Sequence, residues 1–437
     1  MSTPTWWPIS GRRLLSYWIT MQPFNLIKKY PDELKAALAA MGVYCAMYAF
    51  RKPFTMITFD DLTYFGIHYK VWLVSAQLMG YALSKILGIK IISELTHAKR
   101  LPFLLLIIGI AWFTLFLFAL IPPPYSIFIL FLNGLPLGLV WGIVFSYLEG
   151  RKSTDIMGVV LASSFIFSSG FVKSVGGFLL KSNVSDQWMP FVTGALFIIP
   201  FIILIFFLNA IPPPTAEDIS QRNVRTPMNA SSRKQIIVNW AGILIPLTLV
   251  YVFYTALRDF RDNFTNELFI EMHISNIWMV VRGELMITVL ILFLLGGFVL
   301  VKDHRKAISF IHLIMIGAFI IILLTSLFYR LHVISGFTWY IMLGVGVFAG
   351  YIPFNCILAD RLIAVIKTRS NAGFIMYWMD AFGYTSVLIM LLLKEWMTIH
   401  FSYMDFYIRL IYVLGFAGLI LVLYSYFIIQ KLIPHHD

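Results

Sequence analysis

Two arginines of this chain, Arg51 and Arg258, lie in strongly apolar segments and could hold a small anion. A planar guanidinium binds a phosphate or carboxylate through two hydrogen bonds. Each arginine has one tyrosine seven positions before it and another three or four positions before it. Because seven residues make about two helical turns, we expect these tyrosines on or near the face of the arginine. The four tyrosines are Tyr44, Tyr48, Tyr251 and Tyr254.

Other charged residues in apolar segments also predict a polar cavity, because a charged side chain in a membrane usually faces a cavity or a partner. Lys173 and Asp380 lie in opposite halves of the chain. We expect them to pair across the halves, since pairing lowers the free-energy cost of burying each charge. Binding of an anion or of a proton could break this pair, or the pair could be static. Lys85 is expected on the pore face.

A structural role for the same cations remains an alternative. Arg51 and Lys52 could extend their charged ends to the outer membrane interface, and we expect this of Lys52. Arg258 could pair with the nearby Asp259 or Asp262 instead of binding a solute.

Several further polar groups in apolar segments are expected to connect helices rather than to bind a ligand. They are Gln77, Asn133, Asn355 and His312. Arg282 and Glu284 are two positions apart, so on one helix they point in different directions and are not partners.

The composition is that of an integral membrane protein with many spans. Of the 437 residues, 60% are hydrophobic and only 12% are charged, whereas soluble domains carry about 25% charged residues. The net charge of +12 comes largely from short basic loops, which argues against binding of nucleic acid. The two cysteines, Cys45 and Cys356, lie in predicted helices, so neither a disulfide framework nor a metal cluster is expected. No cofactor is implied.

Apolar stretches of about 20 residues predict twelve membrane-spanning helices. Their ranges are 36–57, 70–92, 101–121, 125–148, 155–180, 188–211, 238–260, 275–301, 306–329, 336–359, 371–394 and 406–430. The loops that carry most of the lysines and arginines alternate with loops that carry few, and the positive-inside rule then places both termini in the cytoplasm.

One long polar stretch divides the predicted spans into two sets of six, as in many secondary transporters. The expected organisation is an N-terminal cytoplasmic or interfacial segment, a six-helix bundle, a cytoplasmic linker, a second six-helix bundle and a cytoplasmic tail. These parts cover residues 1–35, 36–211, 212–237, 238–430 and 431–437.

This organisation resembles the major facilitator superfamily, and short motifs resemble its organophosphate:phosphate antiporter branch. Members of that branch have a tyrosine-rich first helix that ends in Arg-Lys-x-Phe, a Ser-Lys pair in the second helix, Phe-Leu-Asn-Gly in the fourth, and Ala-Gly-Phe and Phe-Gly-Tyr in the eleventh. The matching residues here are Tyr44, Tyr48, Arg51, Lys52 and Phe54, then Ser84-Lys85, Phe131-Leu132-Asn133-Gly134, Ala372-Gly373-Phe374 and Phe382-Gly383-Tyr384. The sequence departs from the branch at Lys173, where members often have histidine, and around Asp380, so we interpret the chain as a divergent relative.

The resemblance implies a secondary active transporter of a small anionic solute that works by alternating access. An organic phosphate is the leading substrate class, carboxylates come next, and exchange and proton coupling both remain open. We expect a monomer in a bacterial inner membrane. A receptor of the same fold that senses a phosphorylated metabolite without net transport is the alternative. We do not expect an enzyme, because the sequence has no cluster of His, Asp or metal ligands near an interface.

Overall fold

A computed structural model describes residues 31–59, 62–148, 154–212, 230–276, 278–296, 301, 303–366, 372–397 and 401–432. Long helices dominate these ranges. Those of the first half are α3 (Pro31–Tyr48), α4 (Tyr69–Glu94), α5 (His97–Leu120), α6 (Ser126–Leu148), α7 (Thr154–Lys181) and α8 (Met189–Asn209). Those of the second half are α11 (Ala241–Asn263), α13 (Trp278–Gly296), α14 (His304–Arg330), α15 (Gly336–Cys356), α17 (Ala372–Met397) and α18 (Tyr403–Leu432).

Short elements complete the described chain. They are η1 (Pro53–Met56), the antiparallel strands β1 (Thr63–Tyr64) and β2 (Ile67–His68), α10 (Ala230–Asn239), α12 (Thr265–Glu271) and α16 (Leu358–Ile366). Helix α10 therefore occupies the C-terminal part of the segment that was predicted to be a polar linker.

Eleven helices of the described chain are long and apolar enough to cross a membrane. Each falls within a few residues of a predicted span, so the all-helical membrane fold is confirmed. The first predicted span, 36–57, is different, because its helix α3 covers only Pro31–Tyr48 and begins with charged residues. The chain then passes through turns into η1, whose first residue, Pro53, has no backbone N–H to continue a helix. The count of twelve spans and the cytoplasmic termini stay predictions.

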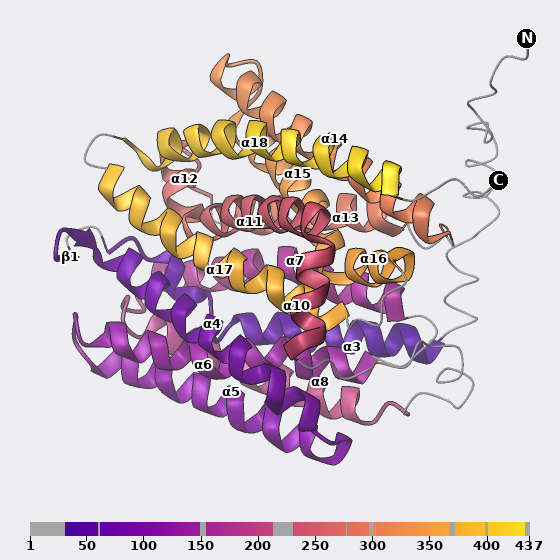
Figure 1. Ribbon diagram of the computed structural model, residues 1–437. Helices are drawn as coiled ribbons and strands as arrows, with labels where there is room; N and C mark the ends of the chain where they lie inside the picture. Colours follow the sequence, from indigo (N-terminus) through magenta and orange to yellow (C-terminus); the bar gives the residue numbers. More distant parts are fainter. Residues whose placement is uncertain are drawn as a thin grey trace, which may run out of the picture.

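The two halves of the chain form two layers of helices that lie against each other (Figure 1). In the first half, α4 packs on α6 and α3 on α7, and in the second half α11 packs on α17 and α18. Contacts between the halves run mainly through α7 with α13 and through α4 with α17.

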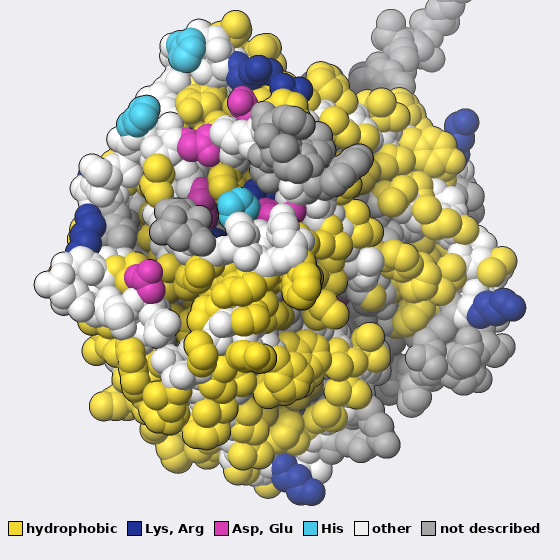
Figure 2. All heavy atoms as spheres, turned by 90° about the vertical axis from the view of Figure 1, so that its left-hand side faces the viewer, with side chains coloured by type: hydrophobic (Ala, Val, Ile, Leu, Met, Phe, Trp, Pro, Cys, Tyr) yellow, Lys and Arg dark blue, Asp and Glu magenta, His cyan; other side chains and the backbone are white. Residues whose placement is uncertain are grey.

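Large apolar side chains are exposed on the outer sides of many helices, as expected for surfaces that face lipid. Examples are Phe113, Ile199, Phe293 and Ile420, each more than half exposed. Figure 2 shows hydrophobic side chains over much of the face in view, with acidic side chains mainly in its upper part and several basic side chains around its edges.

Buried polar side chains connect the helices of the first half, as predicted for Gln77 and Asn133. The amide of Gln77 donates to the backbone carbonyl oxygen of Arg51 (3.0 Å) and to Asn133 Oδ1 (2.7 Å). The Asn133 amide in turn donates to backbone oxygens of Phe50 (3.2 Å) and Ala111 (2.9 Å). These bonds fix the turn after α3, and with it the position of Arg51.

In the second half, His312 of α14 bonds to Ser425 of α18 (3.1 Å), which confirms its predicted contact between helices. Asn355 differs from the prediction, because its amide donates to Tyr351 O (3.3 Å) one turn earlier on the same helix, α15.

Glycines let the backbones of α4 and α6 approach closely. A β-carbon on Gly134 would collide with the carbonyl oxygen of Gln77, and one on Gly80 with that of Phe131. Gly109 of α5, by contrast, has no atom near the place of a β-carbon.

We therefore expect Gly134→Ala to lower the free energy of unfolding by about 1–3 kcal/mol, because backbone atoms cannot move aside easily. Gly109→Ala, the matched control, is expected to raise it by up to about 1 kcal/mol, because alanine favours helix. Thermal unfolding of the purified variants in detergent measures both. Equal effects of the two substitutions would contradict the close approach of α4 and α6.

Candidate functional site

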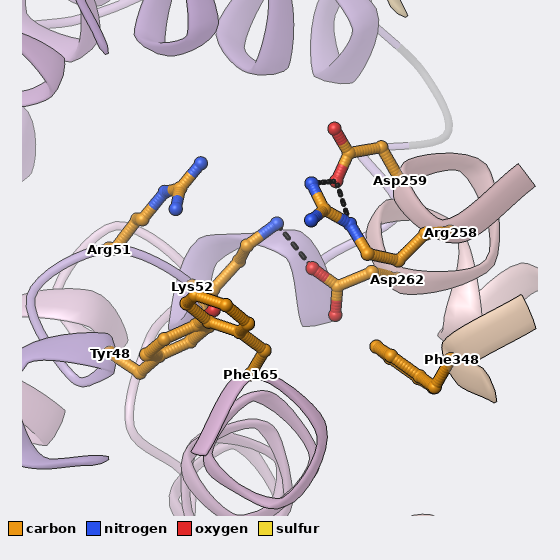
Figure 3. Close-up of a pocket in the computed structure, with 8 residues that line it drawn as sticks. All are labelled: Tyr48, Arg51, Lys52, Phe165, Arg258, Asp259, Asp262 and Phe348. Carbon is orange, nitrogen blue, oxygen red and sulfur yellow. Dashed lines mark hydrogen bonds and ion pairs between the residues drawn. The ribbon is translucent and has the colours of Figure 1, made fainter. Parts of the chain in front are cut away.

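A pocket between the two halves brings together charged residues from both (Figure 3). The empty space around these residues, counted together with adjoining open solvent, is about 300 Å³. The first half contributes Tyr48, Arg51, Lys52 and Phe165, and the second half contributes Arg258, Asp259, Asp262 and Phe348. The turn after α3 carries the first cations, and successive turns of α11 carry Arg258 and Asp262. The pocket therefore contains both predicted arginines, with one from each half.

Arg51 has no ion pair with any carboxylate of the described chain. Its residue is 8% exposed, and its guanidinium carbon lies 4.1 Å from the ring centre of Tyr81 on α4. The aromatic face stabilises the charge in place without neutralising it. This buried cation is therefore available to an anion in the pocket.

Lys52 and Lys173 share the carboxylate of Asp262, which joins the two halves. The ammonium of Lys52 lies 2.5 Å from Asp262 Oδ2, and that of Lys173 lies 2.7 Å from Asp262 Oδ1. Lys52 also donates to Asn263 Oδ1 (2.8 Å), and Lys173 donates to Thr265 Oγ1 (3.2 Å). Both lysines are buried, so a single carboxylate compensates two charges inside the protein.

Arg258 forms an ion pair with its neighbour Asp259 through one carboxylate oxygen. Both its Nε (3.2 Å) and its Nη2 (2.8 Å) donate to Asp259 Oδ1. Its guanidinium carbon lies 4.1 Å from the ring centre of Tyr351, which repeats the arrangement of Arg51 over Tyr81 in the other half. Arg258 thus forms the ion pair that the sequence allows as an alternative, and its side chain still lines the pocket.

The polar groups at the pocket carry an excess of positive charge. Arg51, Lys52 and Arg258 line the pocket with two carboxylates, Asp259 and Asp262. Lys173, which is not in the lining, shares Asp262, so the cluster has four cations against two carboxylates. Because charge buried without compensation is strongly unfavourable, an excess of two charges favours an anion in this place.

Further contacts join the halves towards one end of the molecule. Lys70 of α4 forms an ion pair with Glu267 of α12, and the amide of Asn266 donates to Met56 O (2.8 Å). The backbone N–H of His68 donates to Glu395 Oε2 of α17 (2.8 Å). Figure 1 places β1 and α12 at this same end.

The predicted pair between Lys173 and Asp380 is wrong. Lys173 pairs with Asp262, and Asp380 lies 3.4 Å from Lys85 of α4 and accepts a hydrogen bond from Tyr251. Asp380 is on α17, which packs against α4 rather than against α7 in this structure. Lys85 lies at an interface between the halves but does not line the pocket, so its place on the pore face stays a prediction.

Lys52 also differs from its prediction. Its side chain does not extend to the membrane interface but is buried, with 4% exposure, against Asp262. The reason is that α3 ends at Tyr48, so the turn that follows directs Lys52 towards the second half.

The predicted tyrosines do not form one ring around the pocket. Tyr48 lines it, whereas Tyr44 packs edge to face against Trp141 and Phe165. The end of α3 at Tyr48 breaks the helical spacing on which the expectation for Tyr44 rested.

The two tyrosines of α11 also lie outside the pocket lining. The Tyr251 hydroxyl donates to Asp380. Tyr254 is fully buried in the second half, where its hydroxyl donates to Met315 O (2.8 Å) and its ring stacks on Phe319. The geometry gives Tyr254 a packing role.

The sequence interpretation missed three features of the site. Phe165 and Phe348 line the pocket, but nothing distinguishes them among 39 phenylalanines. Arg261 is buried against Glu284 (2.9 Å), which also accepts from the Tyr340 hydroxyl (2.5 Å). As predicted, Arg282 is not the partner of Glu284.

A family model described as "Family of unknown function (DUF5690)" matches residues 53–431. None of the curated proteins matches the sequence. Similarity to proteins of stated activity therefore comes from solved structures.

Several solved transporters share the fold. The nucleoside transporter NupG has a TM-score of 0.60 and 13% identity, over 92% of this chain and 99% of that one. The inward-open xylose transporter XylE from E. coli has a TM-score of 0.59 and 14% identity, over 93% and 96%. An inward-facing bacterial homologue of the human lysosomal transporter Spinster has a TM-score of 0.55 and 14% identity, over 92% of this chain and 98% of that one. XylE is a proton:xylose symporter of the major facilitator superfamily, so this chain has the fold of that superfamily.

Proposed function

The chain belongs to the DUF5690 family and has the major facilitator fold, and on this basis we propose that it is a secondary active transporter of a small anionic solute. The observation that carries this proposal is the pocket between the halves, whose cations, counted with Lys173 on Asp262, exceed its carboxylates by two. An organic phosphate is the leading substrate class and a carboxylate the next, in keeping with the resemblance of the motifs to the organophosphate:phosphate antiporter branch.

Binding of an anion between the halves explains how transport would proceed. Arg51 stands on one half and Arg258 on the other, so one anion can contact both. Such an anion stabilises the state in which both halves close around it more than the states open to one side. The halves then rock about the solute, by exchange with a second anion or with proton coupling.

The contacts between Lys70, Glu267 and their neighbours join the halves at the end that the predicted topology places outside the cell. We place the protein in a bacterial inner membrane as a monomer, in agreement with the distribution of its basic loops.

Binding of anions is expected to stabilise the purified protein against heat. A ligand at about a hundred times its dissociation constant adds about 2.7 kcal/mol to the folded state. Thermal unfolding in detergent would be followed with organic phosphates, inorganic phosphate and dicarboxylates, beside a neutral sugar as the control. No stabilisation by any anion would contradict an anion site in the pocket.

Uptake of a labelled, stabilising anion into proteoliposomes then separates transport from sensing. Accumulation that depends on a counter-anion or a proton gradient supports the transporter. Binding without movement across the bilayer would instead support a receptor of the same fold.

A further inference from the structure

Asp259 has a buried carboxylate oxygen that no hydrogen-bond donor of the described chain satisfies. Arg258 directs both of its bonds to Oδ1, and Oδ2 is left without a partner although the residue is only 5% exposed. A buried charged oxygen that has no hydrogen-bond donor lowers the stability of the protein, because nothing offsets its loss of water. Because Asp259 lines the pocket, a donor on a bound solute could reach this oxygen.

The pocket is also polarised from one half to the other. Figure 3 shows Arg51 and Lys52 on one side, and Arg258 with both aspartates on the other. The side formed by the turn after α3 is purely cationic, whereas the side formed by α11 presents Asp259 and Asp262. A solute with only an anionic end would leave Oδ2 of Asp259 without a donor.

Asp262 differs from Asp259 in having its oxygens occupied. Its Oδ2 pairs with Lys52 and its Oδ1 with Lys173, and Ser169 donates to it as well. Of the two carboxylates of the pocket, Asp259 is therefore the one with a buried oxygen that still lacks a donor.

We propose that the solute is a small zwitterion of net negative charge, whose phosphate or carboxylate faces Arg51 and whose protonated amine donates to Asp259. This inference rests on the proposed anion transport and adds the second charged group. The net negative charge follows from the excess of two cations, which a solute of zero net charge would leave uncompensated. The amine follows from Oδ2 of Asp259, because a hydrogen bond between two charged groups is stronger than one from a neutral donor.

The test compares probes that differ only in the amine. O-Phosphoethanolamine is measured against ethyl phosphate, and aspartate against succinate, by calorimetric binding to the whole protein in detergent. In each pair we expect the amine to tighten binding by about tenfold or more, because it satisfies a buried carboxylate oxygen. Tighter binding of O-phosphoethanolamine than of aspartate identifies the anionic group as a phosphate, and the reverse order identifies it as a carboxylate.

Asp259→Asn removes the charge that would hold the amine and keeps the size of the side chain. In this variant we expect the two members of each pair to bind with affinities within about threefold of each other. Asp262→Asn is the matched control, because the carboxylate oxygens of Asp262 already pair with Lys52 and Lys173. It is expected to change the affinities of both members by the same factor and to keep the preference for the amine.

The outcomes separate this inference from the proposed function. Tight binding of ethyl phosphate or succinate with no gain from the amine would overturn the zwitterion and leave the anion transporter standing. A preference for the amine that survives in Asp259→Asn would also overturn it, because the amine would then be recognised elsewhere. Failure of all four probes to bind the wild type would contradict both proposals.

Discussion

Replacing Asp262 by alanine is expected to lower the free energy of unfolding by about 3–5 kcal/mol, because it leaves two buried lysines without their carboxylate. Lys52 is 4% and Lys173 is 1% exposed, so water cannot readily replace the lost partner. Both ion pairs cross from the first half to the second, so the same substitution also weakens the association of the halves. Equilibrium unfolding in mixed detergent micelles measures the change.

A rescue variant distinguishes loss of charge balance from loss of packing. Asp262→Leu combined with Lys52→Met and Lys173→Met removes all three charges while keeping apolar volume. Exchange of a buried ion network for apolar side chains is often neutral or stabilising, so we expect most of the stability to return. A fall of less than about 1 kcal/mol in Asp262→Ala would show that solvent reaches the lysines and would contradict the buried network.

Replacing Arg51 by alanine is expected to weaken binding of the anion by about 30- to 100-fold. Uptake at low substrate concentration is expected to fall by the same factor. This range corresponds to the loss of about two charge-assisted hydrogen bonds. Arg51 is chosen because, within the described residues, its guanidinium contacts the ring of Tyr81 but no carboxylate, so the solute would be its principal counter-charge. Uptake into proteoliposomes and calorimetric binding give the two quantities.

Two further variants complete that experiment. Arg51→Lys keeps the positive charge but loses the planar guanidinium, so we expect an intermediate loss of affinity for the anion, about tenfold. Arg282→Ala removes an exposed arginine of α13 that does not line the pocket, and uptake should stay at the wild-type level. Wild-type affinity in Arg51→Ala would place the anion elsewhere.

The membrane fold could be predicted closely from sequence because its signal is local. A run of about 20 apolar residues identifies a span without knowledge of its neighbours. The first span was the exception, and Pro53 was the available sign that its helix ends earlier than the apolar run. Arg51 and Arg258 could be found in the same way, since charge within an apolar segment is itself unusual.

The partners of the buried charges could not be predicted, because they depend on how the two halves are docked. Lys173 was assigned to Asp380 from the equivalence of their helices, but a different set of helix contacts gives it Asp262. Asp259 and Asp262 were recognised only as partners for Arg258. The different roles of Asp259 and Asp262 arise because Lys52 and Lys173 both pair with Asp262. The spacing of residues along one helix does not predict contacts with other helices.

The excess of two positive charges has a consequence for the electrical behaviour of the proposed transport cycle. If the empty pocket changes its exposure from one side of the membrane to the other, those charges cross part of the membrane field. A full crossing involves about 2.3 kcal/mol per charge for every 100 mV. Each negative charge that a solute brings removes one charge from that movement. Membrane voltage then acts mainly on the return of the empty carrier, which favours a cycle in which one anion is exchanged for another.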